Sequence, residues 1–276
     1  MILVADAGGT KTDWRLLDGD EIAQFVTRGY NPNTHEMADF VNEITPTFLH
    51  VKNQVKKLCF YGASIYPSNT AFKEGIEHMF PQAEIDINND LLGTCRSLSS
   101  DEPGFVGILG TGSAGCFYDG KEIINHPPSL GYALGDEGSG AVLGKTVLNL
   151  ALRNRLDPAV QQKFDLEFKL SKEEVYQFVY KREGPNTYLA SFTRFLLANK
   201  SNAQMNRVIR EGFEQYYKAF FLSMENRQDY PFHFSGSVAY YFGDYLREIG
   251  IELGLSIGKI VQSPIAGLAL YHQDHG

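Results

Sequence analysis

A glycine-rich segment near the start of the chain carries residue types that bind phosphate. The segment reads Asp6-Ala7-Gly8-Gly9-Thr10-Lys11-Thr12 and follows the apolar run Ile2–Ala5. Glycines let backbone N–H groups approach an anion closely, and threonine hydroxyls add further donors. The alternative is a tight turn with no ligand. On the first interpretation, polyphosphate contacts Gly8, Gly9, Thr10, Lys11 and Thr12.

Asp6 stands at the end of this apolar run. A carboxylate buried there without a partner is energetically costly. A hydrated Mg²⁺ ion is a suitable partner, because it keeps several of its waters and takes only one or two carboxylates. We therefore expect Asp6 to bind Mg²⁺ through water. The alternative is that Asp6 caps the backbone of its own turn.

A second glycine-rich turn, Gly110-Thr111-Gly112-Ser113, lies 101 residues after Gly9-Thr10. It follows the apolar run Phe105–Leu109, and Thr111 and Ser113 supply hydroxyl donors again. Two turns of similar composition, each after an apolar run, favour phosphate binding over a purely structural role. We expect Gly110, Thr111, Gly112 and Ser113 to hold the same phosphates as the first turn.

Three nucleotide-loop patterns overlap this region, and none of them fits fully. Gly115–Glu122 resembles a Walker A loop, but Glu122 stands where a Mg²⁺-binding Ser or Thr is required. Ser139–Thr146 lacks the first glycine, and no apolar strand precedes it. Gly110–Gly115 satisfies the dinucleotide pattern GxGxxG, but a strand and a turn follow where that pattern requires a helix. Hairpin turns that bind phosphate remain the better interpretation.

The two turns belong to an internal repeat. When the sequence is shifted by 101 residues, Asp18–Ile22 aligns with Asp119–Ile123 without a gap. Each copy reads as a strand, a glycine-rich turn, a second strand and an Asp-Gly turn. The second strands are expected at Trp14–Leu17 and Cys116–Tyr118. This repetition predicts two related lobes.

Strands and helices alternate after the first hairpin, which predicts an α/β lobe with a largely parallel sheet. The expected elements are Met37–Val51 (helix), Lys57–Tyr61 (strand), Asn69–Phe80 (helix) and Ala83–Ile87 (strand). We expect a small N-terminal lobe of residues 1–113, joined by the C-terminal helix 266–276.

The second lobe, residues 114–265, is expected to be larger and more helical. Apolar residues recur three and four apart along Ala203–Met224, which predicts a long core helix. The other expected elements are helices at Ala141–Arg153, Lys172–Tyr180, Thr187–Ala198, Val238–Ile249 and Ile265–Tyr271 and a strand at Phe232–Phe234.

Composition excludes several classes of protein. The formal net charge of -8 over 276 residues disfavours nucleic acid as a partner, because binding a polyanion requires many lysines and arginines. No apolar run is long enough for a transmembrane helix and no secretory leader is recognisable, so we expect a cytoplasmic protein without a membrane partner. The three cysteines are dispersed and form no CxxC pair, which disfavours disulfides and metal clusters.

Four motifs, in order along the chain, resemble one known superfamily: DAGGTKTD (6–13), ILGTGSAG (108–115), GDEGSG (135–140) and FSGSVA (234–239). They are similar to the sugar-kinase, heat-shock chaperone and actin superfamily, and within it to the BadF/BadG/BcrA/BcrD-type ATPase family that contains N-acetylglucosamine kinase. The resemblance implies two ribonuclease-H-like lobes with a nucleotide cleft between them. It also implies ATP and Mg²⁺ as cofactors, and transfer of the γ-phosphoryl group to the 6-hydroxyl of an amino sugar, N-acetylglucosamine first among them.

The resemblance extends to individual residues. Gly236 and Ser237 are expected to lie against the adenosine. Asp90, in the pair Asn89-Asp90, is expected to touch the sugar and to accept the proton of its hydroxyl as the catalytic base. Four more residues are expected to bind the sugar: Asn33, Ser64, Gly131 and Asp136. The resemblance also implies a symmetric homodimer.

Each substrate-side residue has a structural alternative. In these alternatives, Asp90 caps a helix that starts at Leu91 and Asp136 belongs to a helix N-terminus. Asn33 is then a turn residue after Pro32. The functional alternative for the whole chain is an ATP-hydrolysing switch or sensor of the same superfamily, with no sugar acceptor. The kinase is favoured because a switch requires no polar substrate pocket.

Overall fold

The apolar run near the chain start forms the central strand of a five-stranded sheet. The computed structural model, which describes residues 1–8, 11–30, 32, 36–182 and 184–276, gives this sheet the order β3-β2-β1-β4-β5. β1 pairs antiparallel with β2 and parallel with β4, which in turn pairs parallel with β5. The strands are β1 (Ile2–Ala7), β2 (Lys11–Asp18), β3 (Glu21–Arg28), β4 (Lys57–Gly62) and β5 (Glu84–Asn89).

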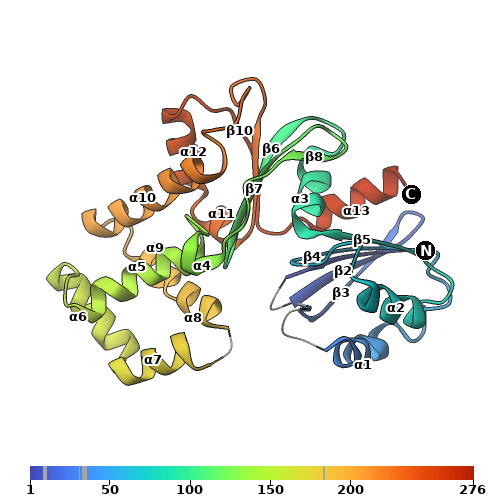
Figure 1. Ribbon diagram of the computed structural model, residues 1–276, viewed down its shortest axis with the longest axis horizontal. Helices are drawn as coiled ribbons and strands as arrows, with labels where there is room; N and C mark the ends of the chain where they lie inside the picture. Colours follow the sequence, from blue (N-terminus) through green and yellow to red (C-terminus); the bar gives the residue numbers. More distant parts are fainter. Residues whose placement is uncertain (9–10, 31, 33–35, 183) are drawn as a thin grey trace. The chain divides into compact units, whose positions relative to one another are not determined.

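One face of this sheet packs against α1 (Met37–Phe48) and α2 (Thr70–Met79), as Figure 1 shows. The core on this side is aromatic. The Trp14 ring lies 4.9 Å from that of Phe48 and 5.7 Å from that of Phe60, in edge-on contacts that suit aromatic quadrupoles. Side chains alternate along a strand, so the residues between these core positions point to the other face.

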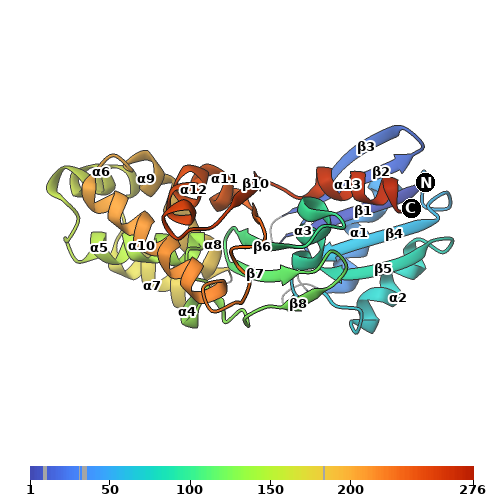
Figure 2. The same cartoon turned by 90° about the horizontal axis from the view of Figure 1, so that it is seen from above.

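The other face of the sheet is covered by α3 (Asp90–Ser99) and α13 (Ile265–Asp274), which lie side by side in Figures 1 and 2. Leu268 of α13 packs there with the buried Tyr61. α3 approaches the sheet closely at Gly93, where a Cβ atom would lie 2.8 Å from the Tyr61 ring. Two helices from distant parts of the sequence thus close this side of the sheet.

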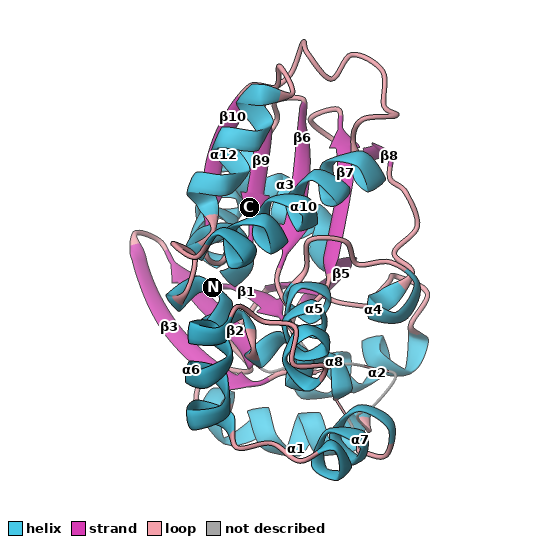
Figure 3. Ribbon diagram, turned by 90° about the vertical axis from the view of Figure 1, so that its left-hand side faces the viewer, coloured by secondary structure: helices cyan, strands magenta, loops and turns pink. Residues whose placement is uncertain are grey.

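The second sheet has the same strand order as the first. Its order is β8-β7-β6-β9-β10 (Figure 3), so β6 corresponds to β1, β7 to β2, β8 to β3, β9 to β4 and β10 to β5. β6 pairs antiparallel with β7 and parallel with β9. This shared order confirms the two related lobes that the internal repeat predicts. The strands are β6 (Gly104–Leu109), β7 (Ser113–Tyr118), β8 (Ile123–Asn125), β9 (Phe232–Ser235) and β10 (Ile257–Val261).

Helices make up most of the rest of the second unit. The predicted core helix is present as α10, and its apolar stripe, from Met205 to Phe220, is buried. None of the described helices combines the length and the apolar character needed to cross a bilayer. The helices are α4 (Gly131–Leu134), α5 (Gly140–Leu152), α6 (Pro158–Phe168), α7 (Lys172–Tyr180), α8 (Pro185–Ser191), α9 (Thr193–Ala198), α10 (Ala203–Phe220), α11 (Ser237–Tyr241) and α12 (Gly243–Glu252).

The boundary between the units differs from the sequence expectation. The predicted first lobe, 1–113, includes residues 103–113, which belong to the second unit because β6 forms a hairpin with β7 and a parallel pair with β9. The hairpin turn Asp119–Glu122 belongs to the first unit. The first unit consists of Met1–Glu102, Asp119–Glu122 and Ser263–Gly276, and the second of Pro103–Tyr118 and Ile123–Gln262.

Candidate active site

Predicted site residues of the first unit lie at the carboxyl ends of three neighbouring strands. In the parallel register, Ala7 of β1, Gly62 of β4 and Asn89 of β5 lie side by side. Gly8 and Asp90 directly follow the ends of β1 and β5, and Ser64 is the second residue after β4. Ligands of α/β sheets bind at this edge. Ser64 is exposed and adopts the left-handed backbone conformation, with φ 60°.

Asp6 faces the side of the sheet that α3 and α13 cover, because Val4, two residues earlier, packs in that core. Its cross-strand partner in the register of β1 and β2 is Asp13, so two carboxylates stand opposite each other on one face. Lys11 forms an ion pair with Asp13 at 2.7 Å. Asp13 is therefore part of the carboxylate cluster, although its sequence position alone did not nominate it.

Burial, together with the charges of Asp90 and Asp13, raises the pKa of Asp6 to about 7, although Lys11 and a hydrogen bond from Ser263 act to lower it. The charged form of Asp6 is thus opposed by burial and by two other carboxylates, more than Lys11 favours it. This is the environment in which a carboxylate gains most from a cation. The described residues include no group of three or more metal-ligating side chains, and a mostly hydrated Mg²⁺ ion requires only one or two carboxylates. The residues present fit that ion.

Asp90 is the first residue of α3, and the cap of this helix is the residue before it. The Asn89 side chain accepts the backbone N–H of Leu92 at 2.8 Å. Burial raises the pKa of Asp90, while hydrogen bonds from the backbone N–H groups of Leu91 and of Asp90 itself lower it. The helix therefore has a cap without Asp90, and the charge of this carboxylate at the sheet edge contributes to the raised pKa of Asp6.

The first glycine-rich turn is described only in part. Gly8 donates its N–H to the Lys11 carbonyl at 2.9 Å and so closes the hairpin. Thr12 corrects a prediction: it is fully buried and donates its hydroxyl to the Arg28 carbonyl at 3.1 Å, because it lies on the sheet face opposite to Asp13. Its hydroxyl is committed to the sheet and not to phosphate. Three other predicted residues lie outside the described residues: Gly9, Thr10 and Asn33.

The second glycine-rich turn joins β6 to β7 in the second unit. Gly110 donates its N–H to the Gly112 carbonyl at 3.0 Å, which closes the turn. The first residues of α5 donate back to it: Gly140 to the Gly110 carbonyl at 2.8 Å and Ala141 to the Thr111 carbonyl at 3.1 Å. The turn therefore lies at the N-terminus of a 13-residue helix, where the helix dipole favours anions.

Asp136 lies beneath this turn and does not cap the following helix, because the Ser139 side chain does so. Asp136 is 7% exposed, and its backbone has a φ of 55°, which is rare for residues other than glycine. Burial raises its pKa, against hydrogen bonds from the backbone N–H of Ser113 and the Ser129 side chain. Gly131 begins α4 with a φ of 71°.

Gly236 stands between β9 and α11, where only glycine fits. Its φ is 115°, and a Cβ atom would lie 2.3 Å from the Leu109 carbonyl oxygen at the end of β6. Ser237 is the first residue of α11. The predicted adenosine-binding pair therefore lies directly beside the strand that leads into the Gly110–Ser113 turn.

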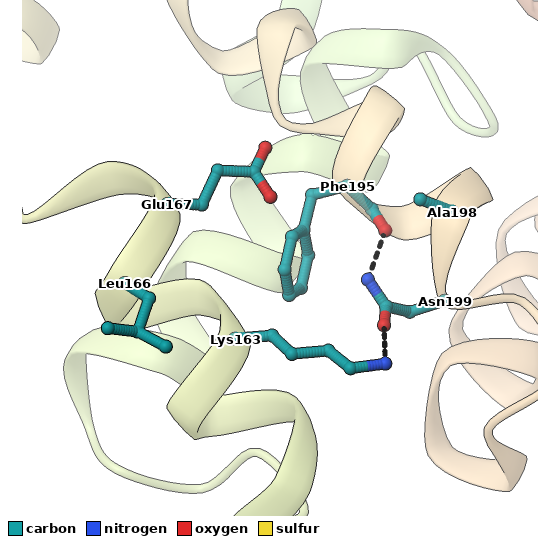
Figure 4. Close-up of a pocket in the computed structure, with 6 residues that line it drawn as sticks. All are labelled: Lys163, Leu166, Glu167, Phe195, Ala198 and Asn199. Atoms are coloured by element: carbon teal, nitrogen blue, oxygen red, sulfur yellow. Dashed lines mark hydrogen bonds between the residues drawn. The ribbon is translucent and has the colours of Figure 1, made fainter.

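A surface depression of about 460 Å³ lies elsewhere in the second unit, between α6 and the end of α9 (Figure 4). Asn199 accepts a hydrogen bond from Lys163 at 3.2 Å and donates one to the Phe195 carbonyl at 2.9 Å, so its amide is satisfied within the protein. None of the residues around the depression is a predicted site residue: Lys163, Leu166, Glu167, Phe195, Ala198 and Asn199.

A buried polar network lies between α3, α13 and β4, and sequence patterns gave no sign of it. Arg96 of α3 donates to the Tyr61 hydroxyl at 2.6 Å, and the same hydroxyl is hydrogen-bonded to Nε2 of His272 at 2.8 Å. Arg96 also lies 3.7 Å from the Asp86 carboxylate. Because Tyr61 is the β4 neighbour of Asp6 and Arg96 shares a helix with Asp90, the network fixes α3 against the strand beside Asp6.

His272 makes the stability of the first unit dependent on pH. Burial, together with the charges of Arg96, Lys57 and His275, lowers its pKa to about 4. In the unfolded chain the His272 imidazole binds a proton near pH 6.5, whereas in the folded protein it stays neutral down to about pH 4. The folded state is therefore fully stable with respect to this group above pH 6.5, and it loses free energy of unfolding as the pH falls toward 4. We expect His272→Gln to reduce the pH slope of the unfolding free energy in this window by up to about 1.4 kcal/mol per pH unit. Urea unfolding from pH 4 to 8 measures this slope, and an unchanged slope contradicts the assignment.

Comparison with solved structures places the chain among known proteins. A protein from Porphyromonas gingivalis, provisionally named an N-acetylglucosamine kinase, has a crystal structure that matches this one with a TM-score of 0.94. The two sequences are 33% identical, and the match covers 99% of each chain. The chain belongs to the BadF-type ATPase family, in its N-acetylglucosamine kinase-like group. The α/β fold of two ribonuclease-H-like units, the second more helical, is thereby confirmed.

This BadF-type ATPase shares its fold with more distant proteins. A second provisionally named N-acetylglucosamine kinase, from Chromobacterium violaceum, is 18% identical with a TM-score of 0.66 over 98% of each chain. A glucokinase of the ROK family from Streptomyces griseus, in complex with glucose and AMPPNP, is 13% identical with a TM-score of 0.55 over 100% of this chain and 98% of its own. No family model matches the chain, and no curated protein does.

Proposed function

We propose that this BadF-type ATPase is a kinase that transfers the γ-phosphoryl group of ATP to the 6-hydroxyl of an amino sugar, N-acetylglucosamine. The observation that carries the proposal is the position of Asp90. It stands at the carboxyl end of β5, near enough to Asp6 for its charge to raise the pKa of that residue, in a helix whose cap is Asn89. A base at this position serves the attack of a hydroxyl group on the γ-phosphorus, and the reaction without sugar distinguishes a sugar hydroxyl from water as that group.

Asp90 is proposed to accept the proton of the sugar hydroxyl as that oxygen attacks the γ-phosphorus. A base is more effective when its pKa approaches the working pH, and burial raises the pKa of Asp90 in that direction. Its place in the first turn of α3 also restricts its side chain, which keeps the carboxylate oriented. The N–H groups of Leu91 and Asp90 hold the charged form available for proton transfer.

Asp6 is proposed to hold Mg²⁺ through water, with Asp13 nearby on the same face of the sheet. When bound, Mg²⁺ neutralises charge on the β- and γ-phosphates. Lys11 already forms an ion pair with Asp13, which leaves Asp6 as the less compensated of the two carboxylates. We therefore assign the metal to Asp6.

The phosphates are proposed to bind at glycine-rich turns of both units. In the second unit, Gly110–Ser113 lies at the N-terminus of α5, and a Cβ atom added at Gly110 would meet no described atom of that unit within 4 Å. Open space over backbone N–H groups at a helix N-terminus suits an anion. Gly236 and Ser237 are proposed to contact the adenosine. In the first unit, Gly8 to Lys11 are assigned the same role as Gly110–Ser113.

The sugar is proposed to bind Asn33, Ser64, Asp90, Gly131 and Asp136. Hydroxyl groups require donors and acceptors in fixed positions, and a buried carboxylate such as Asp136 supplies acceptor capacity of that kind. The choice of N-acetylglucosamine rests on the name of the P. gingivalis relative, which is 33% identical over 99% of both chains.

Product analysis tests this function. The purified protein is incubated with ATP, Mg²⁺ and N-acetylglucosamine, and the sugar phosphate is identified by ³¹P–¹H correlation NMR. We expect a phosphorus coupled to the protons on carbon 6. The matched control is the 6-deoxy sugar, which lacks the attacking hydroxyl and is expected to give no product. Phosphate at another carbon, or product from the 6-deoxy sugar, contradicts the proposal.

A further inference from the structure

Asp136 forms several contacts with the Gly110–Ser113 turn, and binding a sugar would not require them. Its carboxylate accepts the backbone N–H of Ser113, the last residue of the turn. The Ser129 hydroxyl donates to the same carboxylate at 3.3 Å. On the other side, a Cβ atom at Gly112 would lie 3.1 Å from Oδ2 of Asp136. The carboxylate therefore lies in direct contact with the turn.

The backbone around Asp136 is joined to the same turn. The Ser113 hydroxyl donates to the Glu137 carbonyl at 2.9 Å, and Ser139 donates its N–H to the Asp136 carbonyl at 3.0 Å. The next two residues, Gly140 and Ala141, donate their N–H groups to the first two carbonyls of the turn. Residues 136–141 thus form hydrogen bonds with Gly110, Thr111 and Ser113 of the turn, and Asp136 is the residue of this segment whose carboxylate takes part in them.

A carboxylate next to an anion-binding turn has two opposed effects. Its charge repels phosphate, which weakens nucleotide binding. Its hydrogen bond with the Ser113 N–H fixes the turn, which strengthens binding because less conformational freedom is lost when the nucleotide arrives. Asp136 also holds a left-handed backbone, which is unfavourable for most residues other than glycine. A strained, buried acid at this place is consistent with the second effect being the larger.

We propose that Asp136 is a positioning residue that holds the Gly110–Ser113 turn in its phosphate-binding shape, so that nucleotide affinity depends on Asp136 before any sugar is present. The inference deepens the proposed function and rests on it, because the turn concerned is the one assigned to phosphate. It adds to the sugar-binding role proposed for Asp136. It also gives a reason why one acid would influence both substrates.

The test uses Asp136→Gly, since glycine adopts the left-handed conformation without strain and only the carboxylate is lost. The matched control is Asn154→Gly, which replaces another left-handed residue of the second unit, with a φ of 51°, that is exposed and distant from the turn in sequence. ADP binding is measured by calorimetry with ADP alone and no sugar. We expect Asp136→Gly to raise the Kd by about tenfold, the effect of losing one hydrogen bond to a charged group. Asn154→Gly is expected to leave the Kd unchanged.

Hydrogen exchange of the ligand-free protein gives a second readout. We expect amide protons of the peptide that contains 110–113 to exchange faster in Asp136→Gly and at the wild-type rate in Asn154→Gly. Unchanged or tighter ADP binding by Asp136→Gly overturns the proposal, because the carboxylate would then be neutral or merely repulsive. Failure of the kinase assignment is a separate result: the wild-type protein would bind ADP and phosphorylate no sugar.

Discussion

Asp90→Asn will lower kcat by about 10²–10⁴, the contribution of a positioned general base, while the affinity for ATP stays nearly constant. The amide has almost the shape of the carboxylate, but it accepts no proton from the sugar hydroxyl. The fold should tolerate the change, because the cap of α3 is Asn89, which is untouched. Steady-state kinetics with sugar in excess, together with calorimetric titration of ATP, separate the two effects.

Asp39→Asn is the matched control for this experiment. Asp39 is the acidic residue in the first turn of α1 in the same unit, and it lies on the surface. Its replacement removes a comparable first-turn charge from a helix that carries no predicted site residue. We expect wild-type kcat from this variant. Wild-type turnover from Asp90→Asn would remove Asp90 from the mechanism.

Asp6→Asn will raise the Mg²⁺ concentration required for half-maximal activity and lower activity at fixed Mg²⁺ by about 10–100-fold. That range is typical for the loss of a group that orients a bound metal. The charge of Asp6 is opposed by burial and by Asp90 and Asp13 more than Lys11 and Ser263 favour it, so a bound cation would stabilise the carboxylate. ATP binding without metal should not weaken, because the change removes a negative charge.

Asp18→Asn serves as the control for Asp6. Asp18 ends β2 on the surface of the same unit, and its replacement should leave the Mg²⁺ dependence unaltered. The measurement is a Mg²⁺ titration of turnover at saturating ATP for both variants and the wild type. A wild-type Mg²⁺ profile from Asp6→Asn would assign the metal to another residue.

The two related lobes and the main helices were predictable because they depend on an internal repeat and on local patterns. The repeat around Gly9 and Gly110 predicted two related sheets, and apolar spacing predicted α10. Other elements gave weaker signals. β3 is an edge strand with only two partly buried residues, so its sequence lacks clear alternation. The predicted helix Thr187–Ala198 is interrupted at Phe192 into α8 and α9, which tertiary packing decides.

The carboxylate cluster was predictable only in part. The position of Asp6 at the end of an apolar run nominates it, whereas Asp90 is nominated by the family resemblance of Asn89-Asp90. The place of Asp13 depends on the cross-strand register of β1 and β2, which no single segment encodes. Thr12 was assigned to phosphate by residue type, whereas the alternation of side chains directs it to the opposite face. The Tyr61–Arg96–His272 network joins three distant segments and so has no sequence signature.

The most direct test of the account is an ADP-release assay across a panel of amino sugars, each measured against a reaction without sugar. The account predicts slow release without sugar and strong stimulation by N-acetylglucosamine. The rates of ADP release with related amino sugars give the order of preference of the site. Equal ADP release with and without every sugar would contradict the kinase assignment and favour an ATP-hydrolysing switch.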